Sequence, residues 1–272
     1  MGEQPGWQLS GSGPEAYEKY IVVAFMGKWA QDLVEVVDIQ ADQRVLDVGC
    51  GTGVVTRAVA QRLGTHGKIV GFDVNDVMLQ MAQQFAQQAD LDAIEWQQGD
   101  AASMPFGTAE YDVVLCEQGL QYFPDRAGAL REMARVMVPG GQLALSVWRS
   151  LERHPFFIAL VDALASHLGE DSTSALRAAF SLTEREELRA LVSAAGFRDV
   201  HVRLEVQMSR YPSIEDFVRG YVVATPMAGE IAAMAEADQT RMFQDVVEAL
   251  RDYRDDGGLA APMECHVVTA RK

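Results

Sequence analysis

Residues 45–53, with the sequence VLDVGCGTG, constrain the fold more than any other part of the chain. An apolar run that carries one acidic residue leads into three alternate glycines, and apolar residues at helical spacing follow. Glycine lets a ligand approach the backbone where a Cβ would collide, and the start of a helix offers N–H groups without partners. The stretch therefore predicts a strand, a ligand-binding turn and a helix.

The alternation of strand and helix patterns continues as far as residue 148. Apolar runs typical of buried strands lie at 44–49, 68–73, 94–99, 111–117 and 142–148. Helical spacing occupies 53–63, 75–89 and 125–137, and Asn75 is a residue type that caps helix starts. This order is typical of a mostly parallel sheet with helices on both faces.

After residue 148 the pattern changes. Helical spacing covers 154–168 and 183–197, and the second helix is expected to start on a capping box of Thr183 and Glu186. Residues 198–211 alternate strictly, which predicts an antiparallel strand with one buried face. That apolar face holds Val200, Val202, Leu204, Val206 and Met208. A last strand is expected at 263–271, and the helical patterns between the two strands are too long for a plain loop.

These patterns divide the chain into a core, two insertions and an N-terminal part. A Gly- and Ser-rich tail at 1–14 is expected to be disordered, and 15–40 is expected to form an amphipathic helix. The core comprises 41–150, 181–212 and 260–272, with helical caps inserted at 151–180 and 213–259.

The charge and the cysteine content exclude several classes of partner. Lys and Arg number 23 against 39 Asp and Glu, so a formal net charge of −16 repels nucleic acid and anionic membranes on average. No run approaches the ~18 apolar residues of a membrane span, and the N-terminus lacks the features of a signal peptide. The three cysteines show no disulfide or metal-ligand spacing. We expect a cytoplasmic protein without a metal and without a nucleic-acid or membrane partner.

The acidic residues around the glycine turn narrow the choice of ligand. A dinucleotide fingerprint requires Gly or Ala at position 54, where this chain has Val54, and Asp47 would repel a pyrophosphate. Asp47 suits a cationic amine instead. Asp73 can accept both hydroxyl protons of a ribose, and Asp100 can accept from an adenine amine. S-adenosylmethionine fits all these demands, although both Asp73 and Asp100 are also common cap and turn residues.

The order of four motifs carries a family resemblance. VLDVGCGTG is followed by GFDVNDVML, GDAASMPFGTAEYDVVLCEQGLQYFPD and ARVMVPGGQLALSVW. Residues 45–148 resemble the class I S-adenosylmethionine-dependent methyltransferase core, in the group similar to the type 11 and quinone-biosynthesis enzymes. The resemblance implies a Rossmann-like α/β fold with a seven-stranded, mostly parallel sheet and an antiparallel last strand. The FGIRN-like run of the ubiquinone and menaquinone enzymes is replaced here by QGLQYFPD.

The resemblance also implies a set of cofactor contacts. The helix at 15–40 would act as a lid over the cofactor, with the aromatic pair Tyr17 and Tyr20 covering it or simply packing on the core. The full set expected to bind the cofactor is Asp47, Gly49, Cys50, Gly51, Thr52, Gly53, Asp73, Val74, Met78, Gly99, Asp100, Ala101, Glu117, Gln118 and Tyr20. Within it, Cys50 is expected to be a small packing residue and not a nucleophile.

The acceptor is less constrained than the cofactor, because the methyl group of a sulfonium is already electrophilic and mainly needs alignment. Two residues are candidates for a general base, His154 and Glu117, although a cap role for the first and an architectural role for the second are alternatives. Acceptor contacts are expected from Tyr17, Gln121, Tyr122, His154, Phe157 and Tyr221.

The sequence thus predicts a methyltransferase acting on oxygen, carbon or nitrogen of a small, hydrophobic or aromatic molecule, with S-adenosylhomocysteine as product and a monomer or homodimer as the assembly. The alternatives are a quinone-ring C-methyltransferase and a cofactor-binding protein that transfers no methyl group. A nicotinamide-dependent oxidoreductase shares the alternating fold, but Val54 and Asp47 argue against it.

Overall fold

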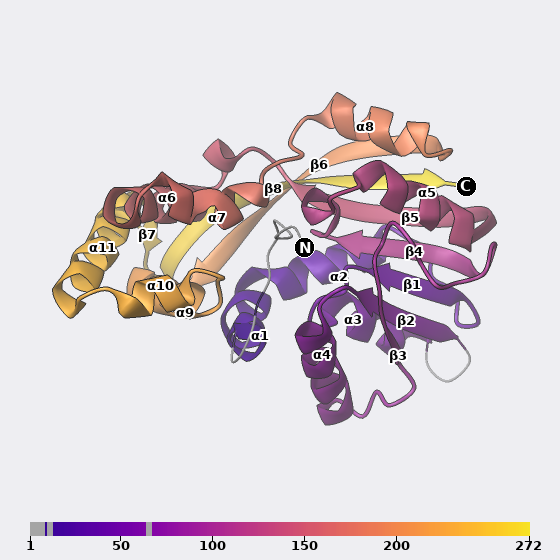
Figure 1. Ribbon diagram of the computed structural model, residues 1–272, viewed down its shortest axis with the longest axis horizontal. Helices are drawn as coiled ribbons and strands as arrows, with labels where there is room; N and C mark the ends of the chain where they lie inside the picture. The colour runs from indigo at the N-terminus through magenta and orange to yellow at the C-terminus, as the bar shows by residue number, and fades with distance from the viewer. Residues whose placement is uncertain (1–8, 10–12, 64–66) are drawn as a thin grey trace.

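The computed structural model describes residue 9 and residues 13–63 and 67–272. Its centre is one twisted sheet, which Figure 1 shows with helices above and below. The strands follow the order β3-β2-β1-β4-β5-β8-β6, and a short β7 pairs with β8. Their bounds are β1 Arg44–Val48, β2 Lys68–Asp73, β3 Glu95–Gln98, β4 Tyr111–Glu117, β5 Met137–Trp148, β6 Arg198–Tyr211, β7 Arg254–Asp255 and β8 Gly258–Arg271.

Parallel pairing joins the first five strands, and β8 runs antiparallel to both of its neighbours. The expectation of seven main strands, mostly parallel with an antiparallel last strand, is confirmed. One boundary differs from the sequence pattern: β5 begins at Met137, whereas the pattern predicts a helix as far as residue 137 and a strand only from residue 142. A register irregularity after Tyr111 accommodates this extension of the strand pair.

Alternate residues of the central strands face opposite layers of helix. Val45 and Val113 belong to one hydrophobic core, whereas the next residues along the chain, Leu46 and Val114, belong to the other. Because successive strand side chains point to opposite faces, a sheet buried on both faces must be apolar at every position. The helices on the two faces are α2 (Gly27–Glu35), α3 (Val54–Leu63), α4 (Asp76–Gln88), α5 (Arg126–Val136) and α8 (Arg185–Ala194).

Caps begin two of these helices where the sequence places suitable side chains. Asn75 Oδ1 accepts hydrogen bonds from the N–H groups of Val77 and Met78, as predicted, and Asp125 accepts from Gly128. The predicted capping box of Thr183 and Glu186 is wrong, because α8 begins at Arg185 and no side chain caps it.

The N-terminal helix lies along the sheet as three consecutive segments: α1 (Gly13–Ala16), the π-helical η1 (Tyr17–Met26) and α2. The expected tail at 1–14 falls almost entirely on residues outside the described part of the chain. The ion pair between Arg57 of α3 and Glu18 joins the helix to the core at 2.9 Å. Only about 15% and 11% of these two side chains are exposed, so the pair is better shielded from water than most surface bridges.

The C-terminal half adds a layer of helices beside the sheet. Figure 1 shows α6, α7, α9, α10 and α11 gathered around the far ends of β6 and β8. Their bounds are α6 Pro155–Leu168, α7 Ser174–Ala178, α9 Ile214–Val223, α10 Ala228–Ala233 and α11 Glu236–Ala249. The proposed division into core and caps stays a prediction. Within the described ranges, no helix has the length and apolar character to cross a membrane.

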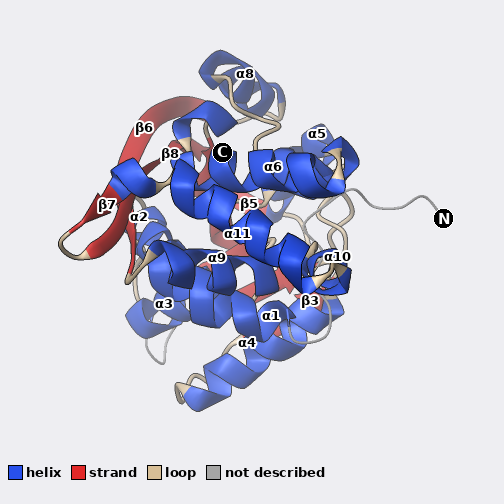
Figure 2. Cartoon of the chain, turned by 90° about the vertical axis from the view of Figure 1, so that its left-hand side faces the viewer, coloured by secondary structure: helices blue, strands red, loops and turns tan. Residues whose placement is uncertain are grey.

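The apolar face of β6 is not buried as the alternating pattern predicts. Val202 is buried, but Leu204, Val206 and Met208 are each about half exposed, at 49%, 53% and 52%. The polar residue Gln207 faces inward instead, and its Nε2 donates to Asp32 of α2. The N-terminal helix therefore covers the polar face of this half of the strand, which lies at the outer edge of the sheet in Figure 2.

Candidate functional site

The glycine turn after β1 is held against the end of β2. The N–H groups of Gly49 and Cys50 donate to Phe72 O at 2.7 and 3.1 Å. The N–H of Gly51 donates to Asp73 Oδ2 at 2.8 Å. Gly49 and Gly51 have φ of +73° and +54°, a region that glycine adopts without strain. The turn and the acidic residue of β2 are thus one rigid unit at the carboxyl edge of the sheet, where α/β proteins bind ligands.

Asp47 lies beneath this turn, and only one of its two carboxylate oxygens accepts a hydrogen bond from the described residues. Its side chain is 1% exposed, and Oδ2 accepts a 2.6 Å hydrogen bond from Thr56 Oγ1 of α3. Oδ1 is buried without a partner among the described residues. Burial raises the pKa of Asp47 to about 7, against the lowering effect of Thr56, and the charge of Asp73 raises it further. A ligand that brings a donor or a positive charge would complete this carboxylate.

The carboxylate of Asp73 combines a turn role with a place in the cavity wall. Oδ1 accepts from Asn75 N at 2.9 Å, and Oδ2 accepts from Gly51. Since each carboxylate oxygen has more than one acceptor direction, lone pairs remain for two hydroxyl groups. Asp100 likewise accepts from Ala102 N at 2.8 Å and lines the same cavity. The predicted neighbours Val74, Met78, Gly99 and Ala101 also line it.

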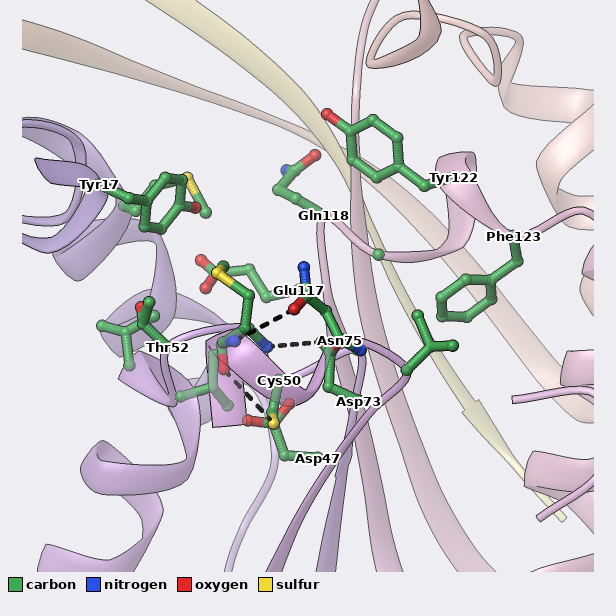
Figure 3. Close-up of a pocket in the computed structure, with 18 of the residues that line it drawn as sticks. Tyr17, Asp47, Cys50, Thr52, Asp73, Asn75, Glu117, Gln118, Tyr122 and Phe123 are labelled. Atoms are coloured by element: carbon green, nitrogen blue, oxygen red, sulfur yellow. Dashed lines mark hydrogen bonds between the residues drawn. The ribbon is translucent and has the colours of Figure 1, made fainter. Parts of the chain in front are cut away.

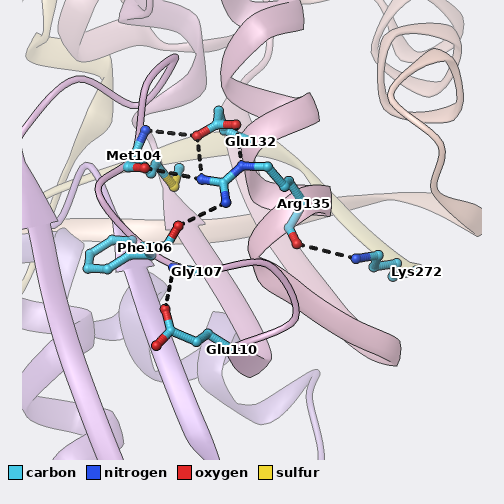
Figure 4. Close-up of polar contacts among 7 residues, drawn as sticks. All are labelled: Met104, Phe106, Gly107, Glu110, Glu132, Arg135 and Lys272. Carbon is cyan, nitrogen blue, oxygen red and sulfur yellow. Dashed lines mark hydrogen bonds and ion pairs between the residues drawn. The ribbon is translucent and has the colours of Figure 1, made fainter.

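The loop that follows Asp100 is fixed to α5 by the side chains of Arg135 and Glu132, shown in Figure 4. Arg135 donates to Phe106 O at 2.8 Å and to Met104 O at 3.1 Å, and its Nε lies 2.6 Å from Glu132. Glu132 in turn accepts from Met104 N at 2.9 Å. The C-terminal residue Lys272 donates to the carbonyl of Arg135. The position of the loop after Asp100 therefore depends on Glu132 and Arg135 of α5, and Lys272 in turn contacts Arg135.

Two residues at the end of β4 form the opposite wall. The N–H of Gln118 donates to Ser146 O at 3.0 Å, and its φ of +49° ends the strand. Glu117 is 8% exposed, and its Oε1 is buried without a partner among the described residues. Burial raises the pKa of Glu117 well above its usual range, and Asp47 and Asp32 add to this effect. Sequence and structure therefore agree that Glu117 and Gln118 face the cavity.

Aromatic side chains enclose the other end of the cavity. Figure 3 shows Tyr17 entering from the N-terminal helix and Tyr122 from the segment after β4. Burial raises the pKa of Tyr17 well above its usual range, and Glu117 and then Tyr122 raise it further, so these groups lie within electrostatic reach of one another. The aromatic residues that line the cavity near them are Phe25, Trp148, Phe157 and Tyr221. The predicted acceptor contacts Tyr17, Tyr122, Phe157 and Tyr221 are thus brought together.

His154 is not placed to act as the predicted general base. It is fully buried, does not line the cavity, and its Nδ1 lies 3.0 Å from Ser150 O. Nε2 lies 2.9 Å from Glu264 O and 3.2 Å from Glu264 N, so backbone groups hold both ring nitrogens. Burial lowers the pKa of His154 to about 4. The prediction of a catalytic or acceptor-binding His154 is wrong, because β8 and the 150–154 turn occupy both nitrogens.

Three other predicted contacts lie outside the cavity wall. The ring of Trp96 fills the space beside Gly53, where a Cβ would lie 2.5 Å from it. Tyr20 packs against Gly220 of α9 and not against the cavity. Gln121 is 3% exposed and donates to Gln118 Oε1 at 3.0 Å, behind the wall. Gly53 and Tyr20 as cofactor contacts and Gln121 as an acceptor contact are therefore corrected to packing and supporting roles.

Sequence reasoning missed several residues of the site. Thr56 is buried on the apolar face of α3, beside Val55 and Val59. A polar residue at such a position of a helical pattern indicates a buried hydrogen-bond partner. Phe25 and Trp148 line the cavity although they come from segments 123 residues apart, and no local pattern indicated that they meet. Cys50 and Thr52 line the cavity as predicted, and Thr52 Oγ1 is buried without a partner among the described residues.

Comparison with known sequences gives a consistent result. A family model described as a methyltransferase domain matches residues 39–196. The chain is also similar to the demethylmenaquinone methyltransferase of Staphylococcus carnosus (strain TM300), with 30% identity over 186 residues, which is 64% of this chain and 76% of that protein.

Solved structures share the fold at lower sequence identity. The YcgJ protein from Bacillus subtilis superposes with a TM-score of 0.61 at 20% identity, covering 90% of this chain and 98% of that one. The [4+2]-cyclase SpnF superposes with a TM-score of 0.55 at 22% identity, covering 90% and 80%. At these identities the likeness establishes the fold alone.

Proposed function

The chain belongs to the family of methyltransferase domains, and on that premise we propose that it transfers the methyl group of S-adenosylmethionine to a small, largely hydrophobic acceptor. Methyl transfer follows from the family. The identity of the cofactor and the class of acceptor rest on the residues of the cavity.

The cavity fits this cofactor in three respects. Asp47 Oδ1 and Thr52 Oγ1 are buried polar atoms without partners among the described residues, as expected where a ligand supplies them. Asp73 retains acceptor directions for ribose hydroxyls. Gly51 and Met78 both line the cavity, and a Cβ at Gly51 would lie 3.3 Å from Met78 Cε, so the turn has little room for a side chain at this position. When bound, the cofactor would supply an electrophilic methyl group.

The protein's own contribution would be positioning and the exclusion of water. The N-terminal helix and the C-terminal helices close the cavity with apolar and aromatic groups, and the glycine turn fixes one end of it. Alignment of two reactants in such a site accounts for much of the rate of a displacement. Glu117 would accept a proton or a hydrogen bond at the acceptor end.

A single observation carries the proposal: one cavity joins Asp47, Asp73 and Asp100 to the aromatic end around Tyr122. Titration calorimetry with S-adenosylhomocysteine tests it, and binding with a Kd below about 100 μM is expected. Absence of heat at millimolar ligand would overturn the proposal. Release of S-adenosylhomocysteine from S-adenosylmethionine with a panel of small acceptors then separates transfer from mere binding.

A quinone-ring C-methyltransferase is the second candidate, because the relative from Staphylococcus carnosus bears the name demethylmenaquinone methyltransferase. A demethylated naphthoquinol in the acceptor panel tests it directly. A cofactor-binding protein without transfer would give S-adenosylhomocysteine binding and no turnover with any acceptor. The assembly as monomer or homodimer, the cytoplasmic location and the absence of nucleic-acid partners stay predictions.

A further inference from the structure

The cavity is lined by acidic groups and by no basic side chain among the described residues. The four carboxyl groups belong to Asp47, Asp73, Asp100 and Glu117. The nearby cation Arg57 does not line the cavity, and its guanidinium donates to Thr52 O and to Glu18. A phosphate or carboxylate on the acceptor would therefore meet like charge and no cationic partner, which disfavours anionic acceptors.

Of these four carboxyl groups, Glu117 is the one to which the proposed cofactor site assigns no contact. Asp47 lies under the glycine turn, Asp73 bonds to that turn, and Asp100 lies in the loop after β3. Glu117 comes from β4, and Tyr17 of the N-terminal helix lies within its electrostatic reach. Its open oxygen is buried, so a partner must come from inside the cavity.

Aromatic rings line the same cavity as this carboxyl group. Phe157 and Tyr221 contact edge to face with centroids 5.3 Å apart, and Phe25 and Trp148 do so at 6.4 Å. Tyr17 and Tyr122 also line the cavity. Aromatic faces attract cations, and walls of several rings are a recurring way of recognising ammonium groups. A buried carboxyl group beside such walls adds a charge partner for the same group.

We propose that, given the methyl transfer inferred above, the acceptor is a hydrophobic amine whose protonated nitrogen binds at Glu117 between these aromatic rings. The ammonium passes one proton to the Glu117 carboxylate and becomes a neutral amine. The nitrogen lone pair then forms the N–C bond while the C–S bond breaks, and the electron pair of that bond stays on sulfur. The positive charge moves from sulfur to the methylated nitrogen, so atoms and charge balance. The charge of a bound ammonium favours the ionised carboxylate at the start of this step, and burial, which raises the pKa of Glu117, makes that carboxylate a stronger base for the proton.

Cofactor affinity provides the first arm of the test. Glu117→Gln keeps the shape of the side chain, and Asp32→Asn is the matched control, because Asp32 lies within electrostatic reach of Glu117 but does not line the cavity. Calorimetry should give the same affinity for S-adenosylhomocysteine and for S-adenosylmethionine in all three proteins, within about threefold. A selective loss of either affinity in Glu117→Gln would assign the carboxyl group to the cofactor and overturn the inference. No binding by the wild type would instead overturn the proposed function.

The second arm measures recognition of charge with two probes of equal shape. Benzyltrimethylammonium is a cation, and neopentylbenzene is its neutral counterpart. With S-adenosylhomocysteine saturating, the wild type and Asp32→Asn should bind the cation at least about tenfold more tightly, and Glu117→Gln should lose most of that preference. Equal binding of the two probes by the wild type would overturn the inference while leaving the proposed function intact.

The third arm is turnover with a panel of arylalkyl amines, phenols, arylalkyl carboxylates and a demethylated naphthoquinol. The wild type should form S-adenosylhomocysteine from S-adenosylmethionine when an amine is the acceptor. Glu117→Gln should lower kcat/KM for the amines by about a hundredfold or more. Turnover confined to phenols, carboxylates or the naphthoquinol would contradict an amine acceptor. The wild-type panel needs no variant, so a poorly folded Glu117→Gln protein would not prevent a decision.

Discussion

The hydroxyl of Thr56 donates a 2.6 Å hydrogen bond to Asp47 and thereby leaves only the second carboxylate oxygen open to the cavity. The two residues lie on either side of the glycine turn, in β1 and in α3. This contact orients the carboxylate and lowers its pKa against the larger effect of burial, which raises it.

Thr56→Val removes the hydroxyl at nearly constant volume. Asp47 then loses the hydrogen bond that lowers its pKa, so the carboxyl group is more fully protonated at about pH 7. We expect the affinity for S-adenosylmethionine to fall about three- to tenfold at this pH, measured by calorimetry. Thr56→Ser retains the hydroxyl and serves as the control. Wild-type affinity in Thr56→Val at about pH 7 would contradict this account of the Thr56 contact.

The pKa of Asp47, raised to about 7, makes binding of a cationic ligand depend on pH. Below this pKa the carboxyl group is neutral and its attraction for an amine is lost, so affinity should fall as the pH is lowered. Between about pH 8 and about pH 6 the wild type should lose up to about tenfold in affinity for S-adenosylmethionine. Asp73 and Glu117 face the same cavity and also titrate. The slope assigned to Asp47 is therefore the part that Asp47→Asn removes, and an unchanged slope in that variant would refute the assignment.

His154 should contribute to stability and not to the chemical step. Its folded-state pKa of about 4 lies below the ordinary value of 6.5, so the unfolded chain binds more protons between these values. The free energy of unfolding should therefore fall as the pH drops through this window, by up to about 3 kcal/mol from this group. His154→Gln should show a shallower dependence in urea titrations at about pH 7 and about pH 5. At equal folded fraction its pH–rate profile should match that of the wild type. Loss of the low-pH limb of the profile in the variant would restore a role as general base.

Alanine substitutions at two glycines with positive φ should distinguish the effect of backbone strain on stability from an effect on ligand binding. Gly51→Ala strains a backbone at φ +54° and brings a Cβ to 3.3 Å from Met78, in the wall of the cavity. Gly169→Ala strains a backbone at φ +91° with no atom within 4 Å of the new Cβ. Both variants should lose about 1 kcal/mol or more of stability in urea titrations. Only Gly51→Ala should also lose affinity for S-adenosylhomocysteine, by about tenfold or more. Equal losses of affinity would mean that general destabilisation explains both.

Arg135 should act as a positioning residue for the loop after Asp100. Arg135→Lys keeps the charge but cannot reach both Met104 O and Phe106 O while pairing with Glu132. We expect KM for S-adenosylmethionine to rise about three- to tenfold with kcat changed less than about twofold. Arg131→Lys, on the same helix but exposed, is the control. A fall in kcat with an unchanged KM would show that Arg135 does more than position this loop.

The sequence by itself determined the succession of strands and helices along residues 44–148 and the acidic end of the cavity. Asp47, Asp73 and Asp100 lie near the carboxyl ends of β1, β2 and β3, and parallel strands bring these ends to one edge, so local pattern was sufficient. The glycine turn at Gly49 and Gly51 could also be predicted from the sequence, because the positive φ at these positions depends on residues close by in the chain. Gly53 was misassigned because its neighbour, Trp96, comes from a strand 43 residues away in the chain.

Only the tertiary structure decided which side chains close the acceptor end. Tyr17 faces the cavity and Tyr20 faces α9, although the two lie three residues apart on one helix. His154 had the chemistry of a base, but the antiparallel pairing of β5 with β8 brings Glu264 onto its ring. Hydrophobic periodicity is a local property that a chain carries in its sequence. The environment of a polar side chain depends on which distant segments pack around it, and that is settled only when the whole core assembles.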